Sequence, residues 1–305
     1  MKEFSVTVLG SSAAMATADR NLTSHLVNHC NRLFLIDCGE GTQFRLRDLK
    51  IKTNRIRHVF ISHLHGDHFY GLIGLISTMH LMRRSEELTI HGPVQLESLI
   101  RLQLEASETT LVYPLKFEVT DPDKEKVIYD DGKLQVISFP LKHRIPTTGF
   151  LLKEKEQPRH INKSAADKMG VPLTYFSKLQ QGLDYIAEDG VRVLNSDVTH
   201  PADTPRSYGY CSDTVYNEEV IECIRGCDLL YHEATFRHDL QHAAAEKMHT
   251  TNVQAAIIAF KAGVKRLMIG HFSARYDNLE PLLQEAQNIF PDTMLVEEGI
   301  PVYIT

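Results

Sequence analysis

The sequence lacks the features of several protein classes. No apolar run approaches the ~20 residues that span a bilayer, and Lys2 and Glu3 are followed directly by a predicted strand, so no amino-terminal signal sequence is recognisable. A surplus of positive charge is also lacking. The formal net charge is −6, which argues against a general nucleic-acid coat but allows a local basic patch or a site made positive by metal ions. We expect a cytoplasmic protein without a membrane partner.

Cysteine is scarce as well. The chain has five: Cys30, Cys38, Cys211, Cys223 and Cys227. Their odd number and their apolar surroundings predict reduced, buried thiols instead of a disulfide framework. Cys223 and Cys227 have a spacing that could hold zinc, but no second pair accompanies them, so we interpret them as packing residues.

Residues 56–68, IRHVFISHLHGDH, are the most informative stretch. The segment opens as a short buried strand. His63 and His65 then lie two apart on extended chain, so both imidazoles project to one side. After a glycine that permits a sharp turn, Asp67 and His68 stand at the entry to a predicted helix and approach from another direction. This one segment therefore predicts ligands for two adjacent metal centres.

The ligand types narrow the choice of metal. Imidazole suits zinc, iron, nickel or copper, and a minority of carboxylates without thiolate favours a hydrolytic zinc site. The alternative is a polar loop of surface histidines. We favour the metal site because three His and one Asp in six residues, directly after a buried strand, have no packing purpose.

Other ligand-type side chains follow predicted strands farther along the chain. His143, Asp213, His232 with Glu233, and His271 each stand at or just beyond the end of an apolar segment. Strand ends that carry such residues meet at one rim in α/β enzymes. His249 lies just ahead of a helix that is predicted to begin at Thr251 with a capping box and to end at Gly263. These positions predict one shared site.

Length and patterning predict a single α/β domain over residues 1–305 with one insertion. The strand and helix rhythm breaks over about residues 153–195. From Lys153 to Arg192 there are seven Lys or Arg against six Asp or Glu, so the insertion is not a charged tail. It is either a functional lid or substrate arm, or a solvated excursion without function.

Residues 69–82, FYGLIGLISTMHLM, are apolar on nearly every helical face. They predict a buried helix, or one whose outer half is covered by a second subunit. We interpret this helix as a homodimer contact.

At this point the residues carry a resemblance. His63-Leu64-His65-Gly66-Asp67-His68 is similar to the H-x-H-x-D-H signature of the metallo-β-lactamase superfamily, whose fold is a four-layer αββα sandwich. Further matches resemble the ribonuclease Z family of tRNA 3′-processing endoribonucleases. They are Asp37-Cys38-Gly39-Glu40-Gly41-Thr42-Gln43, Ser212-Asp213-Thr214, His232-Glu233-Ala234-Thr235-Phe236, His249-Thr250-Thr251 and His271-Phe272-Ser273-Ala274-Arg275-Tyr276.

The resemblance implies a role for each matched residue. One zinc would be bound by His63, His65 and His143, a second by Asp67, His68 and His271, and Asp213 would bridge them; Mn²⁺ or another divalent metal is an alternative. Asp67 could accept the proton of the attacking water. His249, oriented by Glu233, would be the general acid. Ser273 and Arg275 would hold substrate phosphate, and Lys163, Lys168 and Lys178 of the inserted substrate-binding arm would contact RNA.

The implied reaction is zinc-dependent removal of the 3′ trailer from precursor tRNA, leaving a 3′-hydroxyl on the tRNA and a 5′-phosphate on the trailer. Two other readings stay open. One keeps the bimetal site but gives it another ester, as in a phosphodiesterase acting on a cyclic nucleotide. The other is a non-catalytic nucleic-acid-binding protein on the same fold.

Overall fold

The computed structural model describes residues 3–305, which form two compact units. The larger, which we call the core unit, contains residues 3–130, 135–153 and 206–305. The smaller, which we call the arm, contains residues 131–134 and 154–205. The insertion was predicted at about 153–195, and the structure carries it on to residue 205. Within residues 3–305, no helix has the length and apolar character to cross a membrane.

The first sheet of the core unit has seven strands in the order β20-β1-β3-β4-β5-β6-β7. They are β1 (Phe4–Gly10), β3 (Ser24–His29), β4 (Arg32–Ile36), β5 (Ile56–Phe60), β6 (Leu88–Gly92), β7 (Leu115–Val119) and β20 (Pro301–Tyr303). Strands β4 to β7 run parallel. The first strand, β1, pairs antiparallel with β20, a strand from the far end of the sequence.

The second sheet also has seven strands, in the order β19-β17-β16-β15-β10-β9-β8. They are β8 (Lys126–Asp130), β9 (Leu134–Leu141), β10 (Thr147–Glu154), β15 (Ser207–Cys211), β16 (Leu229–Glu233), β17 (Leu267–Gly270) and β19 (Thr293–Leu295). Strands β15, β16, β17 and β19 are parallel. Their carboxyl ends therefore reach one edge of the sheet, where α/β proteins place their sites.

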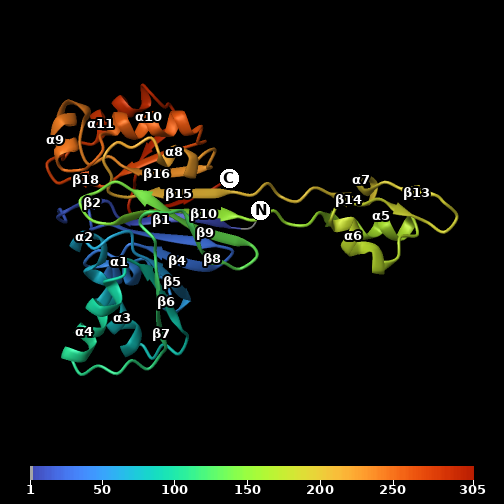
Figure 1. Cartoon of the computed structure of the whole chain (residues 1–305), viewed down its shortest axis with the longest axis horizontal. Helices are drawn as coiled ribbons and strands as arrows, with labels where there is room; N and C mark the ends of the chain where they lie inside the picture. The colour runs from blue at the N-terminus through green and yellow to red at the C-terminus, as the bar shows by residue number, and fades with distance from the viewer. Residues whose placement is uncertain (1–2) are drawn as a thin grey trace. The chain divides into compact units, whose positions relative to one another are not determined.

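Helices cover the outer face of each sheet, which gives the predicted four-layer αββα sandwich (Figure 1). Beside the first sheet lie α1 (Thr42–Asp48), α2 (Gly66–Phe69), α3 (Gly71–Leu81) and α4 (Leu96–Ala106). Beside the second lie α8 (Val220–Cys223), α9 (Gln241–Glu246), α10 (Asn252–Ala262) and α11 (Glu280–Gln287). Short β2 (Ser12–Ala13) and β18 (Phe272–Ser273) pair with each other.

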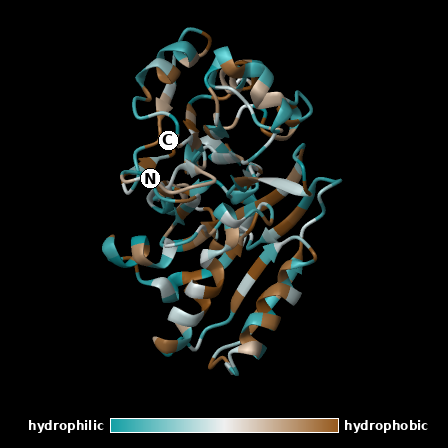
Figure 2. Ribbon diagram, turned by 90° about the vertical axis from the view of Figure 1, so that its left-hand side faces the viewer, coloured by the Kyte–Doolittle hydropathy of each residue, from teal (hydrophilic) through white to brown (hydrophobic). Residues whose placement is uncertain are grey.

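Each sheet forms a hydrophobic core with its helices (Figure 2). Helix α3 shows how the sequence produces this packing. Leu72, Leu75, Ile76 and Met79 recur at helical spacing and are fully buried, the pattern of a helix with one apolar face on a sheet. Leu81 is 77% exposed, so the outer face of this apolar helix is open to solvent.

The predicted helix over residues 69–82 is in fact divided at Tyr70, where α2 ends and α3 begins. Gly71 explains the break. Its backbone N–H donates to the carbonyl of Cys38 at 2.9 Å, and a Cβ at this position would lie 2.0 Å from the carbonyl oxygen of Gly39. Only glycine permits this close approach, which holds α2 and its ligand residues against the loop after β4.

The predicted helix from Thr251 is confirmed as α10. Thr251 accepts from the backbone N–H of Gln254, and the Gln254 side chain returns to the backbone of Thr251, which completes the capping box. Gly263 ends the helix in the left-handed region with φ 62°, the conformation that favours glycine at this place.

The arm is a folded unit instead of an irregular loop. It contains helices α5 (Lys163–Lys168), α6 (Phe176–Gln180) and α7 (Asn195–Val198), the 3₁₀ turn η2 (Leu173–Tyr175) and two short strand pairs, β11 (His160–Ile161) with β14 (Thr199–His200) and β12 (Tyr185–Ile186) with β13 (Arg192–Val193). Its small core consists of Ala166, Val171, Leu179, Val193 and Val198. The side chain of Asn195 stabilises that core by donating hydrogen bonds to the carbonyls of Leu179 and Leu183.

Candidate metal centre

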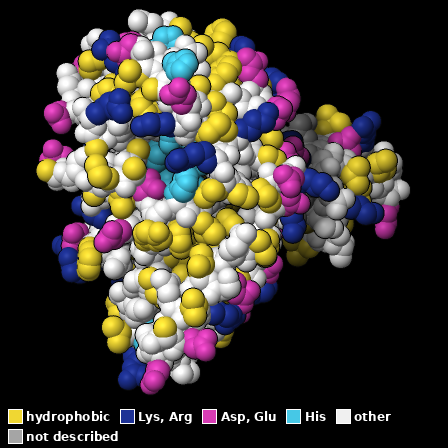
Figure 3. Space-filling model, turned by 60° about the vertical axis from the view of Figure 1, so that its left-hand side comes forward, with side chains coloured by type: hydrophobic (Ala, Val, Ile, Leu, Met, Phe, Trp, Pro, Cys, Tyr) yellow, Lys and Arg dark blue, Asp and Glu magenta, His cyan; other side chains and the backbone are white. Residues whose placement is uncertain are grey.

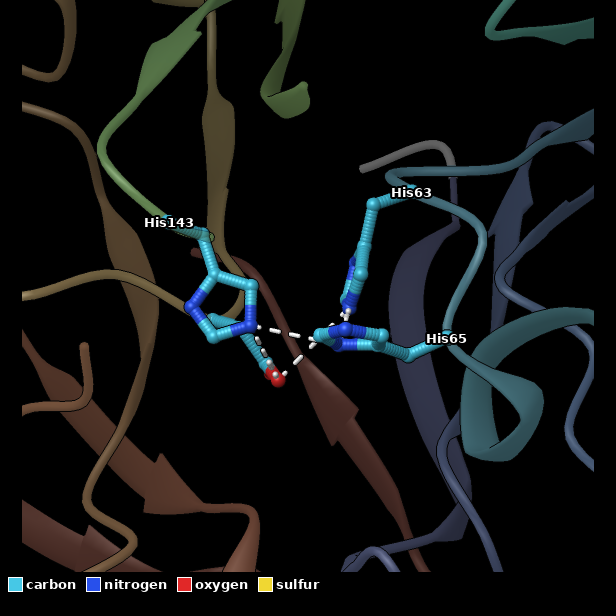
Figure 4. A group of neighbouring side chains, drawn as sticks. His63, His65 and His143 are labelled. Carbon is cyan, nitrogen blue, oxygen red and sulfur yellow. Dashed lines mark hydrogen bonds and ion pairs between the residues drawn. The ribbon is translucent and has the colours of Figure 1, made fainter. Parts of the chain in front are cut away.

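Four predicted ligands converge in a first cluster at the edge of the core unit. His63 and His65 come from the loop after β5, His143 from the loop after β9, and Asp213 from the loop after β15. Nδ1 of His65 lies 3.1 Å from Nε2 of His63 and 3.2 Å from Nε2 of His143. Oδ2 of Asp213 lies 3.6 Å from the His63 nitrogen and 3.7 Å from that of His143. Figure 4 shows the three rings directed toward one point.

A second cluster lies on the other side of Asp213. Oδ2 of Asp67 is 3.5 Å from Nε2 of His68 and 3.4 Å from Nε2 of His271, and those two nitrogens are 3.2 Å apart. Oδ1 of Asp213 lies 3.3 Å from His68 and 3.1 Å from His271. Asp213 thus directs one oxygen to each cluster.

These donor sets fit metal ions. Ligand atoms ~2.0–2.1 Å from a tetrahedral zinc lie ~3.3–3.4 Å apart, close to the separations within both clusters. The side chain of Asp213 is buried, and its Oδ1 accepts no hydrogen bond within residues 3–305. A buried carboxylate oxygen without a hydrogen-bond donor is costly. A cation in the second cluster, beside His68 and His271, would satisfy it.

Opposite electrostatic effects act on the two buried histidines. Burial lowers the pKa of His63 well below its usual value, and neighbouring His68 adds to the effect. Burial also opposes protonation of His68, but the carboxylates of Asp213, Asp67 and Asp37 outweigh it and raise the pKa of His68 well above normal. The site therefore stabilises positive charge between its carboxylates, and a metal ion must displace a proton to bind at His68.

Glu233 and His249 form a pair beside Asp213. Glu233 is the last residue of β16, and its Oε1 accepts from Nδ1 of His249 at 2.9 Å. Burial alone lowers the pKa of His249, but the Glu233 carboxylate and its hydrogen bond raise it to about 9. His249 is consequently protonated at neutral pH. Because Nδ1 is engaged by Glu233, Nε2 is the ring nitrogen left to donate a proton.

The clusters open into a hollow of about 680 Å³ on the core surface. Figure 3 shows histidine side chains at its bottom and Lys and Arg side chains around it. The basic rim consists of Arg144, Lys247 and Arg275. Nε of Arg275 donates to Ser273 Oγ at 3.1 Å, and its guanidinium lies 5.0 Å from the ring centre of Phe236. The predicted phosphate-binding pair thus lies together on the rim.

The three lysines predicted to contact RNA belong to the arm. Lys163 and Lys168 begin and end α5, and Lys178 lies on α6. All three are exposed. The Nζ of Lys178 lies over the ring of Tyr175, 5.0 Å from its centre.

Comparison with known proteins shows full-length relatives. The chain is 47% identical to Ribonuclease Z of Phocaeicola vulgatus over 304 residues, covering 100% of this chain and 98% of that protein. It is 45% identical to Ribonuclease Z of Parabacteroides distasonis, covering 98% and 99%. The chain belongs to the ribonuclease Z family. It is therefore a metal-dependent hydrolytic endoribonuclease.

Further comparisons concern solved structures and family models. The structure of human tRNase Z, short form, superimposes with a TM-score of 0.71 at 28% identity and covers 99% of both chains. Residues 4–155 also match the family described as Anti-Pycsar protein Apyc1. The structure of the metallo-β-lactamase fold protein YhfI from Bacillus subtilis superimposes with a TM-score of 0.70 at 16% identity and covers 99% of this chain and 100% of that chain, which confirms the fold expected from the sequence.

No role was predicted from the sequence for the residues that orient the ligands of this ribonuclease Z centre. The buried Asp37 accepts from Nδ1 of His68 at 2.7 Å, from the backbone N–H and hydroxyl of Ser62, and from the hydroxyl of Tyr210. Thr235 lies 2.8 Å from Nδ1 of His271. The carbonyl of Met248 accepts from Nδ1 of His143 at 2.8 Å. Such partners fix ring orientation and tautomer at metal sites.

Three of these positions have unfavourable backbone conformations. Asp37 has φ 56°, and Met248 and His271 each have φ 58°, a region that non-glycine residues rarely adopt, although Asp and His adopt it more often than most. Such conformations cost ~1–3 kcal/mol each and concentrate at functional sites. A charged residue that ends the buried run LFLID was the signal that could have identified Asp37 from the sequence.

Asp37→Asn tests this orienting role. The amide keeps the size of the side chain but replaces one acceptor oxygen by an NH2 group. His68, Tyr210 and the Ser62 hydroxyl donate to Oδ2, and the Ser62 backbone N–H donates to Oδ1, so in either orientation the NH2 group meets a donor instead of an acceptor. We expect metal affinity to fall roughly 10–100-fold, the usual effect of losing an outer partner of a ligand. Competition with a chelator measures it, and Asp123→Asn, at an exposed loop position, is the control. Unchanged affinity in a folded Asp37→Asn protein would contradict the assignment.

Proposed function

We propose that this endoribonuclease removes the 3′ trailer from precursor tRNA, leaving a 3′-hydroxyl on the tRNA and a 5′-phosphate on the trailer. The observation that carries the proposal is the pair of ligand clusters sharing Asp213 beneath a basic rim. Full-length relatives named Ribonuclease Z and the likeness to human tRNase Z support the choice of substrate.

We assign the metals as two zinc ions per chain, with Mn²⁺ as the alternative. One ion would be held by His63, His65 and His143, the other by Asp67, His68 and His271, with Asp213 shared. Mainly imidazole ligands without thiolate support zinc. When bound, the two ions would activate water and polarise the scissile phosphate.

Asp67 is proposed to accept the proton of the attacking water. The hydrogen bond from Ala14 and the close contacts with His68 and His271 all involve its Oδ2, which leaves Oδ1 for the proton. Burial raises the pKa of Asp67, but His68 and His271 outweigh it and keep the pKa below normal. Asp67 would therefore accept the proton only transiently and release it again to solvent.

His249 is proposed to protonate the leaving 3′ oxygen, with Glu233 holding its ring cationic. Arg275 and Ser273 would bind a phosphate of the substrate, since a guanidinium matches phosphate through two parallel hydrogen bonds. Both assignments depend on positions at the hollow that also contains the metal clusters.

The decisive experiment is incubation with a tRNA precursor that carries a 3′ trailer, followed by mapping of both new ends. We expect a single cut that leaves a 3′-hydroxyl and a 5′-phosphate. Random degradation, or a 2′,3′-cyclic phosphate end, would refute the proposal. The alternative is a phosphodiesterase for small diesters that uses the same bimetal site. Faster turnover of cyclic nucleotides than of the tRNA precursor would support that alternative.

The arm is proposed to recognise the body of the tRNA. A metal centre can bind one phosphate but cannot recognise a folded RNA, so selectivity requires contacts elsewhere. The arm is a separately packed unit with exposed Lys163, Lys168 and Lys178. Its near balance of charge means that a few placed residues would make the contacts.

Removal of the arm should separate binding from chemistry. Lys153 and Ser207 are cross-strand partners on β10 and β15, so a short Gly-Asn turn can replace residues 156–204 and close a hairpin. We expect KM for precursor tRNA to rise strongly and turnover of a small phosphodiester to stay nearly unchanged, because only remote binding is lost. The salt dependence of tRNA binding should also become less steep.

A finer variant checks which arm residues matter. Changing Lys163, Lys168 and Lys178 together to Gln should reproduce part of the KM effect, whereas Lys124→Gln with Lys126→Gln, two exposed core positions, should not. An armless protein that is folded, holds its metals and binds tRNA with the parent affinity and salt slope would show that recognition lies on the core unit.

We also propose a homodimer through the predicted contact at residues 69–82, which we extend to the neighbouring exposed apolar residues up to α4. Leu81, Met82, Val94, Leu99 and Leu102 are exposed there, and apolar patches of this kind mark protein interfaces. Sedimentation velocity gives the mass directly. A monomer at micromolar concentration would refute the assignment.

The proposed place of action is the cytoplasm. All five cysteines are free thiols, as in proteins of a reducing compartment. Fractionation of the source cells would test the assignment.

A further inference from the structure

A second polar cavity lies at the opposite ends of the strands that carry the metal ligands. It encloses about 500 Å³ and is lined by residues from the starts of β4 and β5, from η1 (Thr53–Arg55) and from Tyr129 on β8. Asp37 and His63 follow the carboxyl ends of β4 and β5, whereas the cavity lies at their amino ends. At ~3.3 Å per residue the strands separate the two places by roughly 15–20 Å.

Positive charge concentrates in this cavity. Arg32, Arg55 and Arg57 line it, and no Asp or Glu is among the lining residues that the structure describes. This charge stands out in a chain of net charge −6. Three guanidinium groups around one cavity form the arrangement that binds phosphate, since each presents planar N–H groups that match phosphate oxygens.

Arg55 and Arg57 have capacity left for a ligand. Among residues 3–305, Arg55 is engaged through Nη2 alone, which donates to the carbonyl of Asn31 at 2.7 Å and lies 3.4 Å from its amide oxygen. The position of the guanidinium is thereby fixed while Nε and Nη1 remain to donate. Arg57 pairs with Glu86 at 2.8 Å, but both side chains are more than half exposed. Such exposed pairs contribute little stability, so a phosphate can draw Arg57 away.

Aromatic rings form the other wall. The ring centres of His58 and Tyr129 are 4.6 Å apart, and those of Phe34 and Tyr129 are 5.3 Å apart. Arg32 hydrogen-bonds the Tyr129 hydroxyl, which joins the cationic wall to the aromatic one. Bases stack on such rings with little preference for sequence.

A pair of histidines supplies a donor to the same wall. Nδ1 of His58 lies 3.1 Å from Nε2 of His91, and the buried Nδ1 of His91 has no hydrogen-bond partner within residues 3–305. An orphan acceptor costs less than an orphan donor, so the proton of His91 belongs on Nε2 and donates to His58. Nδ1 of His58 then accepts this hydrogen bond, so neutral His58 carries its own proton on Nε2. That N–H does not contact His91 and can donate to a ligand in the cavity.

From these features we propose that the cavity binds a nucleotide unit, with its phosphate on Arg32, Arg55 and Arg57 and its base against His58 and Tyr129. The volume is in the range of small-molecule sites. An adjoining cavity of about 390 Å³ shares Leu33 and Arg55 and adds two lysines, Lys50 and Lys52, against one acidic residue, Glu3, together with the ring of Tyr303. A second nucleotide can therefore follow the first. The unit can be a free mononucleotide or part of a single RNA strand.

Titration calorimetry on the metal-loaded protein tests the site. The probes are AMP, inorganic phosphate and a single-stranded RNA of five nucleotides. The variant is Arg32→Gln with Arg55→Gln, and the control is Arg47→Gln with Arg101→Gln, which changes two exposed arginines on α1 and α4. We expect AMP to bind more tightly than phosphate, and the variant, but not the control, to weaken AMP at least about tenfold.

The two sources of the nucleotide are distinguished by the oligonucleotide. Tighter binding of RNA than of AMP, with a steep salt dependence that the variant reduces, identifies an RNA strand. Equal affinity for both identifies a free mononucleotide. Undiminished AMP binding in the folded variant would overturn the proposal.

Crosslinking gives a second measurement that does not depend on the variant. An RNA of five nucleotides carrying 4-thiouridine is irradiated with the unaltered protein, and the modified peptides are identified by mass spectrometry. We expect modification of the peptides that contain His58 or Tyr129. Crosslinks confined to residues of the metal hollow would overturn the proposal even if the variant cannot be purified.

Discussion

Asp213→Ala is expected to release metal from both clusters and to lower activity on precursor tRNA by ~10³-fold or more. Each oxygen of Asp213 faces one cluster, at 3.1–3.3 Å from His68 and His271 and at 3.6–3.7 Å from His63 and His143. Loss of the shared carboxylate leaves two sets of imidazoles with less negative charge to hold divalent ions. Several kcal/mol of transition-state stabilisation depend on those ions, and each 1.36 kcal/mol is a factor of ten.

Elemental analysis and single-turnover rates measure both effects. His143→Ala is the informative comparison, because His143 belongs to the first cluster alone and should weaken mainly one ion. Asp123→Ala, at an exposed position, should change neither quantity. A single tightly held metal in the unaltered protein, retained in Asp213→Ala, would show that Asp213 does not bridge two ions.

His249→Ala is expected to slow the chemical step by ~10²–10⁴-fold, the usual effect of removing a positioned proton donor. The ring is held by Glu233 at 2.9 Å, and the pKa of about 9 means that it carries its proton at neutral pH. The loss should fall on kcat instead of KM. Metal content should be nearly unchanged, since His63, His65, His68 and His271 remain.

A change of leaving group separates acid catalysis from a structural role. A nitrophenyl phosphodiester releases an anion that needs no proton, so its hydrolysis should suffer far less from His249→Ala than cleavage of precursor tRNA. His242→Ala is the matched control, because that ring is 91% exposed on α9. Equal losses on both substrates would mean that His249 supports the structure of the hollow.

The ligands could be predicted from the sequence because their spacing is local or follows strand ends. Four of them, His63, His65, Asp67 and His68, lie within six residues. The strands that precede His143, Asp213 and His271 are apolar runs, so the end of each strand can be recognised in the sequence. The orienting role of Asp37 was not predicted, because it depends on contacts with Ser62 and Tyr210 that form only when the two sheets pack together.

Three strands and the fold of the arm were not predicted from the sequence, for other reasons. Strands β7 and β8 are largely exposed at the edges of their sheets. The sequence of β8, KVIYD, shows no hydrophobic alternation, whereas that of β7, LKFEV, alternates and could have been recognised as a strand. β20 has three residues, too few for any period to be read. The arm was predicted as an interruption of the pattern, and its own small core of five side chains is spread over residues 166–198, too thinly to be recognised before folding.

The pairing of β1 with β20 has a consequence for how the protein folds. Ser5 lies opposite Tyr303 in that ladder, and Glu298 accepts from the backbone N–H groups of Ser11 and Asn21, the first of them 287 positions away. Contacts this distant close only after a large loss of chain entropy, and they slow folding. Until β20 arrives, one edge of β1 offers unpaired backbone groups to other chains. During synthesis on the ribosome, the unpaired edge of β1 is therefore the part of the first sheet at which we expect a chaperone to prevent aggregation.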